Sequence, residues 1–589
     1  MRGKIYNVIQ TFVSGERDQN LYYFSKGSVY FEKHAIKFSY LSLIDSHTYF
    51  NTLPLAKIRK HTDINQLMLK VNGNGKFLIS INTANKSGSV VNLFKTVLLL
   101  SGEHILNFSD DCQNIFDERL LSVSIQCLSD KGSIEKMEWV TDISPANEVK
   151  LAIVITHYKR EKAVELALDK ITVELSKAGI DIIVVDNSQS LELPEYPSTF
   201  ILKNENLGGS GGFTRGMLFA KDADYSHVIL MDDDASCEVE SIFRTRMLFQ
   251  YSTQDKLAVS GALLDEEYSY SVWENGAKFN GICKPLMHKL DLRNPRNVSI
   301  IANSSDVIDY GGWWYFGFKL SEIKYFSFPF FVRGDDIMFS MVNDFELITY
   351  AGICSWGDSF SNKTSPITAY LDSRHHIVQL LTHLDLGKSR LNIILIKQML
   401  ICLLSYKYSS AKALLFAMEH ILIGRSFWAD NVDMINVRKD IALLPDEQMT
   451  SNNLISNPKE LFLDDESEPL RVEPLKIEAI HRSLMRLITL NGNLVPGFML
   501  SNDISYQNHE RGIKLKSVFM KKSICYVNRQ GFSYAVSRNN IEAIKIISIF
   551  TIRLIKININ YKYLRKEYSE AFNTFTREKF WEKIFKVKK

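Results

Sequence analysis

Two polar segments in the middle of the chain contain residue types that could bind a phosphorylated ligand and a metal ion. The first is the glycine-rich segment 206–216, NLGGSGGFTRG. The second is the aspartate triplet 232–234, which follows the apolar run 228–231. Clustered glycines before a helix let backbone N–H groups approach a phosphate closely, and carboxylates just past a buried strand can hold the divalent ion that such a ligand brings. Together the two segments predict an enzyme that uses a nucleotide sugar.

Each segment has a simpler explanation when it is taken alone. A glycine cluster is most often a turn, and an aspartate triplet at a strand end can be a solvated turn that caps a helix. The glycine segment fits neither G-x-G-x-x-G, since position 214 is Thr, nor G-x-x-x-x-G-K-[ST], since Met217 follows Gly216. These mismatches disfavour dinucleotide and P-loop sites. The occurrence of both segments after a strand-helix-strand pattern favours the functional interpretation.

That pattern begins at residue 151. The apolar runs 151–155 and 182–185 suit parallel strands that are buried on both faces, and the apolar spacing between them predicts a helix that ends at Gly179. In open α/β sheets, ligands bind outside the carboxyl ends of the strands. We therefore expect the nucleotide sugar to meet one rim built from four loops. The residues expected on this rim are Thr156, Arg160, Asp186, Asn206 and the triplet Asp232, Asp233 and Asp234.

Six short segments occur in an order that is typical of one enzyme family. They are 155–160 (ITHYKR), 185–187 (VDN), 206–216, 231–234 (MDDD), 312–316 (GWWYF) and 334–336 (GDD). The chain thereby resembles the family 2 inverting glycosyltransferases, and more narrowly the bacterial galactofuranosyltransferases that extend cell-surface galactan. The resemblance is strongest over residues 150–380. It implies transfer of galactofuranose from UDP-galactofuranose to a growing, lipid-linked cell-surface polysaccharide.

An inverting transferase needs a base for the acceptor hydroxyl and a Lewis acid for the departing diphosphate. Asp335 and Asp336 are candidates for the first task, with a helix-capping pair as the alternative. The family motif implies that Asp336 is the base and that Asp335 contacts the acceptor. Asp232 and Asp234 would ligate Mg²⁺ or Mn²⁺ and contact the diphosphate, because hard oxygen ligands suit these ions. Asp233 would point toward the sugar or the ribose.

The resemblance also implies roles for five further residues. Asp186 corresponds to a carboxylate that contacts the nucleotide base or ribose, Arg160 to a residue near the diphosphate, and Asn206 to another nucleotide contact. Trp313 and Trp314 correspond to a platform for the acceptor, because sugar C–H faces stack on aromatic rings. A tryptophan pair in the hydrophobic core is the alternative.

The chain departs from the family at one ligand position. The family usually has a metal-binding His directly after a Trp at the place of Trp356, but Gly357 follows here. Asp358 could substitute as an oxygen ligand, or His375 and His376 could reach the ion from the next helix. Alternatively, the two aspartates, diphosphate and water complete the site. A degenerate, inactive enzyme is a further alternative.

The length of 589 residues predicts several domains. We expect a β-rich sandwich or jelly-roll domain over 1–145, a GT-A (Rossmann-like) α/β transferase domain over 146–385, and a mainly helical region over 386–589. In the first domain, alternating apolar residues on both sides of the turn signal 72–75 predict a hairpin. The acidic, proline-containing segment 452–474 predicts a surface linker.

The composition is typical of a soluble cytoplasmic protein. The net charge of +3 argues against a nucleic-acid binder, and seven cysteines without C-x-x-C spacing fit reduced thiols. No signal peptide is expected. The apolar segment 391–406 is shorter than a membrane span, so a buried or interfacial helix is expected.

The C-terminal segment 541–589 has twelve Lys and Arg against five Glu, interleaved with large apolar residues. This composition predicts peripheral attachment to the anionic inner face of the plasma membrane; a helix packed on the transferase domain is the alternative. Two other functions remain open beside the galactofuranosyltransferase: a transferase of another nucleotide sugar such as rhamnose, and a catalytically silent glycan-binding scaffold. A homo-oligomer also remains open.

Overall fold

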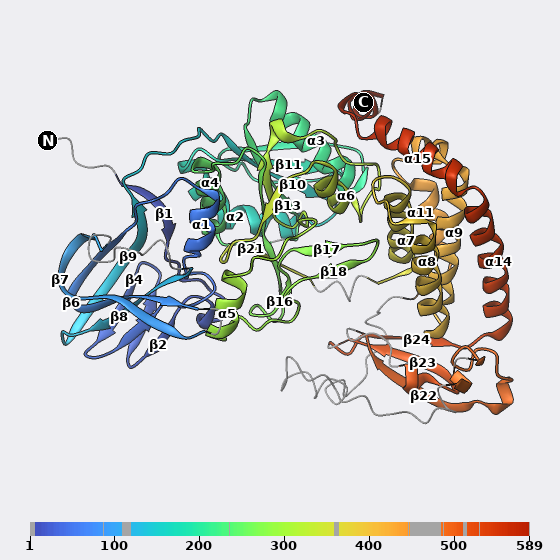
Figure 1. Ribbon diagram of the computed structural model, residues 1–589, viewed down its shortest axis with the longest axis horizontal. Helices are drawn as coiled ribbons and strands as arrows, with labels where there is room; N and C mark the ends of the chain where they lie inside the picture. The colour runs from blue at the N-terminus through green and yellow to red at the C-terminus, as the bar shows by residue number, and fades with distance from the viewer. Residues whose placement is uncertain are drawn as a thin grey trace.

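The computed structural model describes residues 6–85, 88–108, 119–234, 236–358, 364–445, 447, 484–486, 488–509, 515–528 and 530–587. The expected linker 452–474 lies outside these residues. Along the described chain, a β-rich N-terminal part is followed by a mixed α/β part and then by a largely helical part (Figure 1). The mixed α/β architecture predicted for the centre of the chain is confirmed.

The N-terminal part contains one nine-stranded sheet in which every pairing is antiparallel. Its order is β2-β5-β8-β6-β9-β4-β3, while β1 pairs with β9 and β7 with β6. The strands are β1 (Asn7–Thr11), β2 (Phe24–Lys26), β3 (Val29–Glu32), β4 (Ala35–Ser39), β5 (Leu43–Asp45), β6 (Met68–Ala84), β7 (Val90–Leu106), β8 (Leu121–Cys127) and β9 (Lys131–Thr141). Helix α1 (Leu55–His61) precedes β6. The strands β8 and β9 pair with different halves of the long β6, and the sandwich or jelly-roll form of this part stays a prediction.

The predicted hairpin around residues 72–75 is wrong, because β6 runs through this segment without turning. Its glycines allow a close approach of neighbouring backbone instead. A Cβ at Gly73 would lie 2.4 Å from the carbonyl oxygen of Ser133, and Gly75 has a φ of +123°. At this point β6 exchanges β9 for β8 as its neighbour. Glycine inside a strand can mark such a close approach as well as a turn.

The central part contains a seven-stranded sheet in the order β12-β11-β10-β13-β19-β14-β20. The predicted strands at 151–155 and 182–185 are confirmed as β10 and β11, which pair in parallel. The strands are β10 (Leu151–His157), β11 (Asp181–Asp186), β12 (Thr199–Lys203), β13 (His227–Asp232), β14 (Leu257–Ser260), β19 (Phe316–Lys319) and β20 (Glu346–Ile348). The helices of this part are α2 (Glu161–Lys177), α3 (Gly208–Asp222), α4 (Val239–Gln250), α5 (Pro295–Ala302) and α6 (Asp335–Val342).

The central part also contains two smaller sheets. One has the order β16-β15-β21, and the other is the hairpin of β17 and β18. Their strands are β15 (Ala262–Asp265), β16 (Val272–Glu274), β17 (Ala277–Phe279), β18 (Cys283–Pro285) and β21 (Cys354–Gly357).

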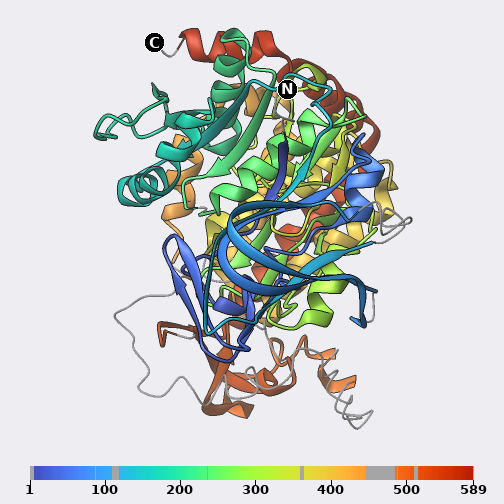
Figure 2. The same cartoon turned by 90° about the vertical axis from the view of Figure 1, so that its left-hand side faces the viewer.

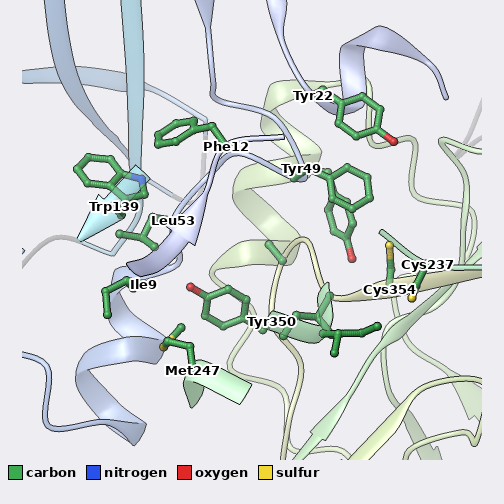
Figure 3. Packing of buried hydrophobic residues seen from close by; sticks show 14 of the residues in the cluster. Ile9, Phe12, Tyr22, Tyr49, Leu53, Trp139, Cys237, Met247, Tyr350 and Cys354 are labelled. Atoms are coloured by element: carbon green, nitrogen blue, oxygen red, sulfur yellow. The ribbon is translucent and has the colours of Figure 1, made fainter. Parts of the chain in front are cut away.

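The N-terminal and central parts share one hydrophobic core (Figure 3). Phe12 and Trp139 of the first part belong to the same buried cluster as Met247 and Tyr350 of the second. Polar contacts cross the same boundary, since the backbone N–H of Thr11 donates to Glu240 of α4 at 2.7 Å. The β-rich part is therefore packed against the central part, and Figure 2 shows the molecule from the side of this part.

The third part begins with five helices and ends with three. They are α7 (Pro366–Leu381), α8 (Gly387–Leu404), α9 (Tyr408–Ile423), α10 (Arg425–Asp430), α11 (Ile435–Ala442), α14 (Asn540–Ile559), α15 (Tyr561–Phe575) and α16 (Glu578–Val587). Between them lies a three-stranded sheet, β22 (Ser501–Asn508), β23 (Lys521–Val527) and β24 (Ser533–Ser537), which the sequence patterns did not predict. Across the described ranges, no helix has both the length and the apolar character needed to span a membrane.

The basic C-terminal segment divides into α14, α15 and α16. Trp581 and Phe585 of α16 are buried in the same hydrophobic cluster as α3, and Tyr568 of α15 is buried beside α9 and α10. For α15 and α16 the structure thus agrees with the alternative of helices packed on the protein. The outer face of α14 differs and bears exposed isoleucines.

Candidate active site

The ends of three neighbouring strands bring the candidate nucleotide-binding residues together. In the parallel pairings, Thr156 at the end of β10 stands beside Asp232 of β13, and His157 stands beside Asp186 of β11. The backbone N–H of Asn204, just past β12, donates to the carbonyl of Asp186 at 2.9 Å. The rim expected from the order of the strands is therefore present.

Arg160 contacts two aspartates of the triplet. Its Nη1 lies 3.2 Å from Oδ1 of Asp233 and 2.5 Å from Oδ2 of Asp234. The backbone N–H of Tyr158 also donates to Asp233 at 3.1 Å. Burial would lower the pKa of Arg160, but the two carboxylates outweigh burial and raise it. The loop after β10 is thus tied electrostatically to the loop after β13.

His157 lies between the two acidic positions of the rim and is fully buried. Its Nδ1 is 3.6 Å from Asp233, and its Nε2 is 4.0 Å from Asp186. Neither ring nitrogen has a hydrogen-bond partner within the described ranges. The family segment includes His157, but the sequence analysis assigned it no role.

Both carboxylate oxygens of Asp186 accept hydrogen bonds from the loop that follows β11. Oδ1 accepts hydrogen bonds from the N–H and the hydroxyl of Ser188, at 2.9 and 2.5 Å, and Oδ2 accepts from the N–H of Leu191 at 2.9 Å. Burial raises the pKa of Asp186, but these hydrogen bonds outweigh burial and hold the pKa below its ordinary value. Its contact with a nucleotide stays a prediction.

The glycine segment does not form a loop before a helix, as the sequence interpretation assumed, because α3 begins at Gly208. A Cβ at Gly208 would lie 2.1 Å from the carbonyl oxygen of Phe331, and one at Gly216 would lie 2.2 Å from Cγ1 of Val154. The glycines are needed because α3 packs directly against the central sheet and the segment before α6. The predicted phosphate-cradling loop is therefore wrong for the glycines themselves.

The start of α3 is held by Asn206 and contacts the second acidic group. Oδ1 of Asn206 accepts the N–H of Gly208 at 3.1 Å, and the hydroxyl of Ser210 donates to Oδ2 of Asp335 at 3.2 Å. The charge of Asp232 contributes to raising the pKa of Asp335. The two acidic groups predicted from separate motifs therefore lie within electrostatic reach of each other.

Asp335 and Asp336 form the first turn of α6. The N-cap position is Gly334, with a φ of +85°, so neither aspartate is itself the N-cap. Asp336 nevertheless accepts the backbone N–H of Ile337 at 2.8 Å, so the alternative of a structural role at this helix start stays beside the catalytic one. Burial raises the pKa of Asp335, and the neighbouring Asp336 raises it further. Burial also raises the pKa of Asp336, against the opposing effects of the Ile337 N–H, which donates at 2.8 Å, and of Arg333. A carboxylate with a raised pKa is a stronger base than an exposed one.

Sequence reasoning missed two buried residues beside Asp336. Glu274, at the end of β16, is 4% exposed, and its Oε1 has no hydrogen-bond partner within the described ranges. Burial and the charge of Asp336 raise the pKa of Glu274 to about 8. Burial also raises the pKa of Tyr310, as do the charges of Glu274 and Asp336. A single Glu before a turn gives no sequence signal, and only the fold brings it to this site.

Position 357 lies beside the aspartate triplet, whereas the two histidines lie elsewhere. Backbone hydrogen bonds of 2.8 and 3.1 Å pair Trp356 with Ser236, just past the triplet. The ring of His375 packs against Gly334, where a Cβ would lie 2.4 Å from its Cγ. Side chains of α7 and α8 bind both imidazoles: Nδ1 of His375 lies 3.0 Å from Gln379 and Nδ1 of His376 lies 2.7 Å from Gln398.

The oxygen donors at the triplet suit Mg²⁺ or Mn²⁺, but they do not form a complete cage. Within the described ranges, no group of three or more His, Cys, Asp or Glu is placed to hold a metal ion. Metal ligation by Asp232 and Asp234 stays a prediction. Asp358, which directly follows β21 and is exposed, is the nearest candidate in sequence for a third protein ligand.

Both tryptophans of the predicted acceptor platform are buried. Trp313 is 4% exposed and packs edge-to-face on Phe213 and Phe339, with ring centroids 4.9 and 5.5 Å apart. Trp314 is 8% exposed and donates its indole N–H to the carbonyl of Gly261 at 3.0 Å. This packing is typical of core tryptophans, and contact with an acceptor stays a prediction.

Comparison with solved structures yields only low similarity. PcManGT, a mannosyltransferase from Pyrobaculum calidifontis in complex with GDP-Man and Mn²⁺, has a TM-score of 0.27 at 14% identity and covers 41% of this chain and 66% of its own. S. aureus TarS 1–349 has a TM-score of 0.27 at 12% identity and covers 50% and 90%. No functional argument rests on similarity at this level.

Sequence comparison is more informative, although no family model matches the chain. The galactofuranosyltransferase GlfT2 of Mycolicibacterium smegmatis is 23% identical over 413 residues, which cover 64% of this chain and 63% of that relative. GlfT2 of Mycobacterium tuberculosis is 22% identical over 386 residues, covering 58% and 59%. GlfT1 of M. smegmatis is 38% identical over 93 residues, covering 15% and 30%. The matched region thus spans less than two thirds of each relative, and the chain is similar in sequence to bacterial galactofuranosyltransferases, as its motifs indicate.

Proposed function

We propose that this protein is an inverting glycosyltransferase with a GT-A-type domain, which transfers galactofuranose from UDP-galactofuranose to a growing lipid-linked polysaccharide. The observation that carries the proposal is that two acidic groups with different environments lie within electrostatic reach of each other. The triplet at the end of β13 is partly neutralised by Arg160, while burial raises the pKa values of Asp335 and Asp336 at the start of α6. The triplet suits binding of a metal ion and diphosphate, and the Asp335–Asp336 pair suits proton transfer.

On the acceptor side, Asp336 takes the proton of the attacking hydroxyl. Its raised pKa makes it a stronger base, and the Ile337 N–H holds one of its oxygens in place. Asp335, fixed by Ser210, contacts the acceptor, and the buried Glu274 adds a third carboxyl group to the same corner. Trp313 and Trp314 would form the platform on which the acceptor sugar lies.

On the donor side, Asp232 and Asp234 would hold Mg²⁺ or Mn²⁺, which when bound supplies Lewis-acid stabilisation of the diphosphate. Arg160 donates to the diphosphate and Asp233 turns toward the sugar or ribose. The remaining contacts to the nucleotide come from the strand ends, namely Thr156, Asp186 and Asn206. The diphosphate would complete the ligand set of the cation, so donor and cation would bind cooperatively.

The test is to incubate the purified protein with UDP-galactofuranose, Mn²⁺ or Mg²⁺ and a short lipid-linked acceptor, and then to determine product mass and linkage. A panel of other UDP- and dTDP-sugars separates this function from a rhamnosyltransferase. Preferential transfer from another donor would refute the galactofuranose assignment. Neither transfer nor donor hydrolysis with any donor, together with retained glycan binding, would favour the silent scaffold.

A further inference from the structure

One side chain of the N-terminal part reaches the residues that follow the aspartate triplet. Arg17 lies in the segment between β1 and the short helix η1 (Gln19–Leu21). Its Nη2 donates to Oγ of Ser236 at 3.1 Å, and Ser236 is two residues past Asp234. The site residues predicted from the motifs all belong to the central part. This contact therefore brings a second part of the chain to the proposed donor side of the site.

The same guanidinium binds two further segments. Its Nη1 and Nη2 contact the two carboxylate oxygens of Glu266, at 2.9 and 3.0 Å, and its Cζ lies 4.7 Å from the centroid of the Trp356 ring. A planar guanidinium can form such a fork and stack on an aromatic face at the same time, whereas the ammonium group of lysine cannot. Arg17 therefore joins three segments, one after β13, one after β15 and one within β21.

These three segments meet around position 357, where the family usually has a metal-binding His. Two backbone hydrogen bonds pair Ser236 with Trp356, and the N–H of Glu266 donates to the carbonyl of Gly357 at 3.1 Å. Arg17 thus binds the side chains of the two residues whose backbones pair with Trp356 and Gly357. The place of the triplet relative to β21 is thereby supported from the N-terminal part.

The segment that carries this guanidinium is itself closely packed. The fully buried side chain of Asn51 accepts the N–H of Val13 at 2.8 Å and donates to the carbonyls of Val13 and Tyr22, at 2.9 and 2.7 Å. A Cβ at Gly15 would lie 2.1 Å from the hydroxyl oxygen of Tyr22. That hydroxyl donates to Glu238 at 2.7 Å, so a second contact reaches the residues after the triplet. The guanidinium therefore extends from a well-held support.

We propose that Arg17 is a positioning residue for donor binding, which acts by holding the residues after the aspartate triplet against β21. The inference rests on the proposed function, because it takes the triplet as the place where the cation and the diphosphate bind. Exposed ion pairs contribute little, but the side chain of Arg17 is only 24% exposed and contacts three segments at once. The N-terminal part thus contributes to the donor site as well as to the shared core.

The experiment compares wild type with Arg17→Gln, Arg17→Lys and Lys37→Gln. Lys37 is the matched control, because it pairs with Glu32 at 2.6 Å on an exposed surface of the same part. Calorimetric titration gives the affinity of each protein for UDP with Mn²⁺. Steady-state transfer gives separate KM values for donor and acceptor, and thermal unfolding shows that each variant is folded.

Arg17→Gln should weaken UDP binding and raise the donor KM roughly tenfold, because a charge-assisted contact that orders the site is lost. The acceptor KM should stay near that of wild type. Arg17→Lys keeps the charge but not the fork, so its UDP affinity should lie between those of wild type and Arg17→Gln. The effects of Arg17→Gln and Glu266→Gln on UDP affinity should not add, since both remove the same contact. Lys37→Gln should match wild type in every measurement.

Amide hydrogen exchange measures the same contact without any donor. The peptides that contain Ser236 and Glu266 should exchange faster in Arg17→Gln than in wild type, because the segments lose a shared partner. Unchanged UDP affinity and donor KM in Arg17→Gln would overturn the proposal, and a lower melting temperature beside them would show a purely structural role. A wild type that binds no UDP would overturn both this inference and the proposed function. A wild type that binds UDP but transfers no galactofuranose, with weaker UDP binding in Arg17→Gln, would count against the proposed function alone.

Discussion

Glu274 and Asp336 lie within electrostatic reach of each other, and burial raises the pKa of both carboxyl groups. In the proposed reaction, only the group that meets the acceptor would need to be ionised. Asp336 accepts the N–H of Ile337, which favours its ionised form, whereas one oxygen of Glu274 has no hydrogen-bond partner within the described ranges. Asp336 would thus be the base and Glu274 a neutral acid beside it.

Asp336→Asn should separate chemistry from binding. We expect UDP affinity near that of wild type and a rate loss of about 10²–10⁴-fold, the usual contribution of a positioned proton acceptor. Calorimetric titration with UDP and single-turnover transfer measure the two quantities. Asp344→Asn, at an exposed carboxylate paired with Lys256, is the matched control and should keep its rate. Joint loss of folding and UDP binding in Asp336→Asn would show a structural role instead.

Glu274→Gln should change how stability depends on pH. The pKa of Glu274 is raised to about 8 from 4.5, so the folded state holds a proton that the unfolded state releases between these values, and wild-type stability falls as the pH rises through this window. The neutral amide lacks this proton loss. We therefore compare the free energy of unfolding of the variant with that of wild type at two pH values. The difference should shift in favour of the variant between about pH 5 and about pH 9, by up to a few kcal/mol. Thermal unfolding at both pH values checks this, and parallel curves for the two proteins would contradict it.

Asp232→Ala and Asp234→Ala should each abolish transfer and weaken metal-dependent UDP binding, a loss of several kcal/mol of transition-state stabilisation. Removing Asp234 also frees Arg160 from its 2.5 Å contact, so UDP binding without metal should fall less. Titration of UDP with and without Mn²⁺ measures both effects. Near-normal turnover in both variants would remove the triplet from the mechanism.

Helix α3 is the element on which the site depends most. Gly216→Ala should destabilise the protein by about 1–3 kcal/mol, although alanine favours helices, because its Cβ would lie 2.2 Å from Val154. Val154→Ala in the same chain should restore part of the loss. Denaturant unfolding of the two single variants and the double variant gives the coupling energy. Additive effects would show that the two residues do not contact each other in this way.

The elements that could be predicted are those whose own residue types indicate whether they are buried or exposed. The run 182–185 is apolar at every position, so a strand buried on both faces was the natural interpretation. Two predictions based on glycines were wrong, namely the hairpin turn at 72–75 and the loop before a helix at 206–216. Gly73 lies within β6 and Gly208 within α3, and each allows the backbone to approach a residue that is distant in sequence. Such an approach is invisible from neighbours in sequence. The same reason hid Glu274, which only the fold brings to Asp336.

The C-terminal helices pack on the central part more closely than their composition suggested. The indole N–H of Trp581 donates to the carbonyl of Ser327 at 2.8 Å, and its fully buried ring lies in the same cluster as α3. Deleting the residues after Asn540 would therefore expose part of the hydrophobic core.

Trp581→Ala should therefore cost about 3–5 kcal/mol of stability and lower transfer activity, even though residue 581 lies far along the chain from every motif. Ile559→Ala, at a side chain that is 77% exposed on α14, is the control and should change stability little. Chemical denaturation measures both. Equal stabilities would show that α16 is an independent appendage.

The tight contacts of α3 have a consequence for the geometry of the proposed reaction. Gly208 places the start of this helix against the carbonyl oxygen of Phe331, just before α6, and Gly216 places a later turn against the side chain of Val154 in the central sheet. The position of the first turn of α6 relative to the sheet is therefore set through one closely packed helix. For a displacement in which the entering and departing oxygens lie on opposite sides of one carbon, such a fixed spacing would keep the alignment the same from one turnover to the next.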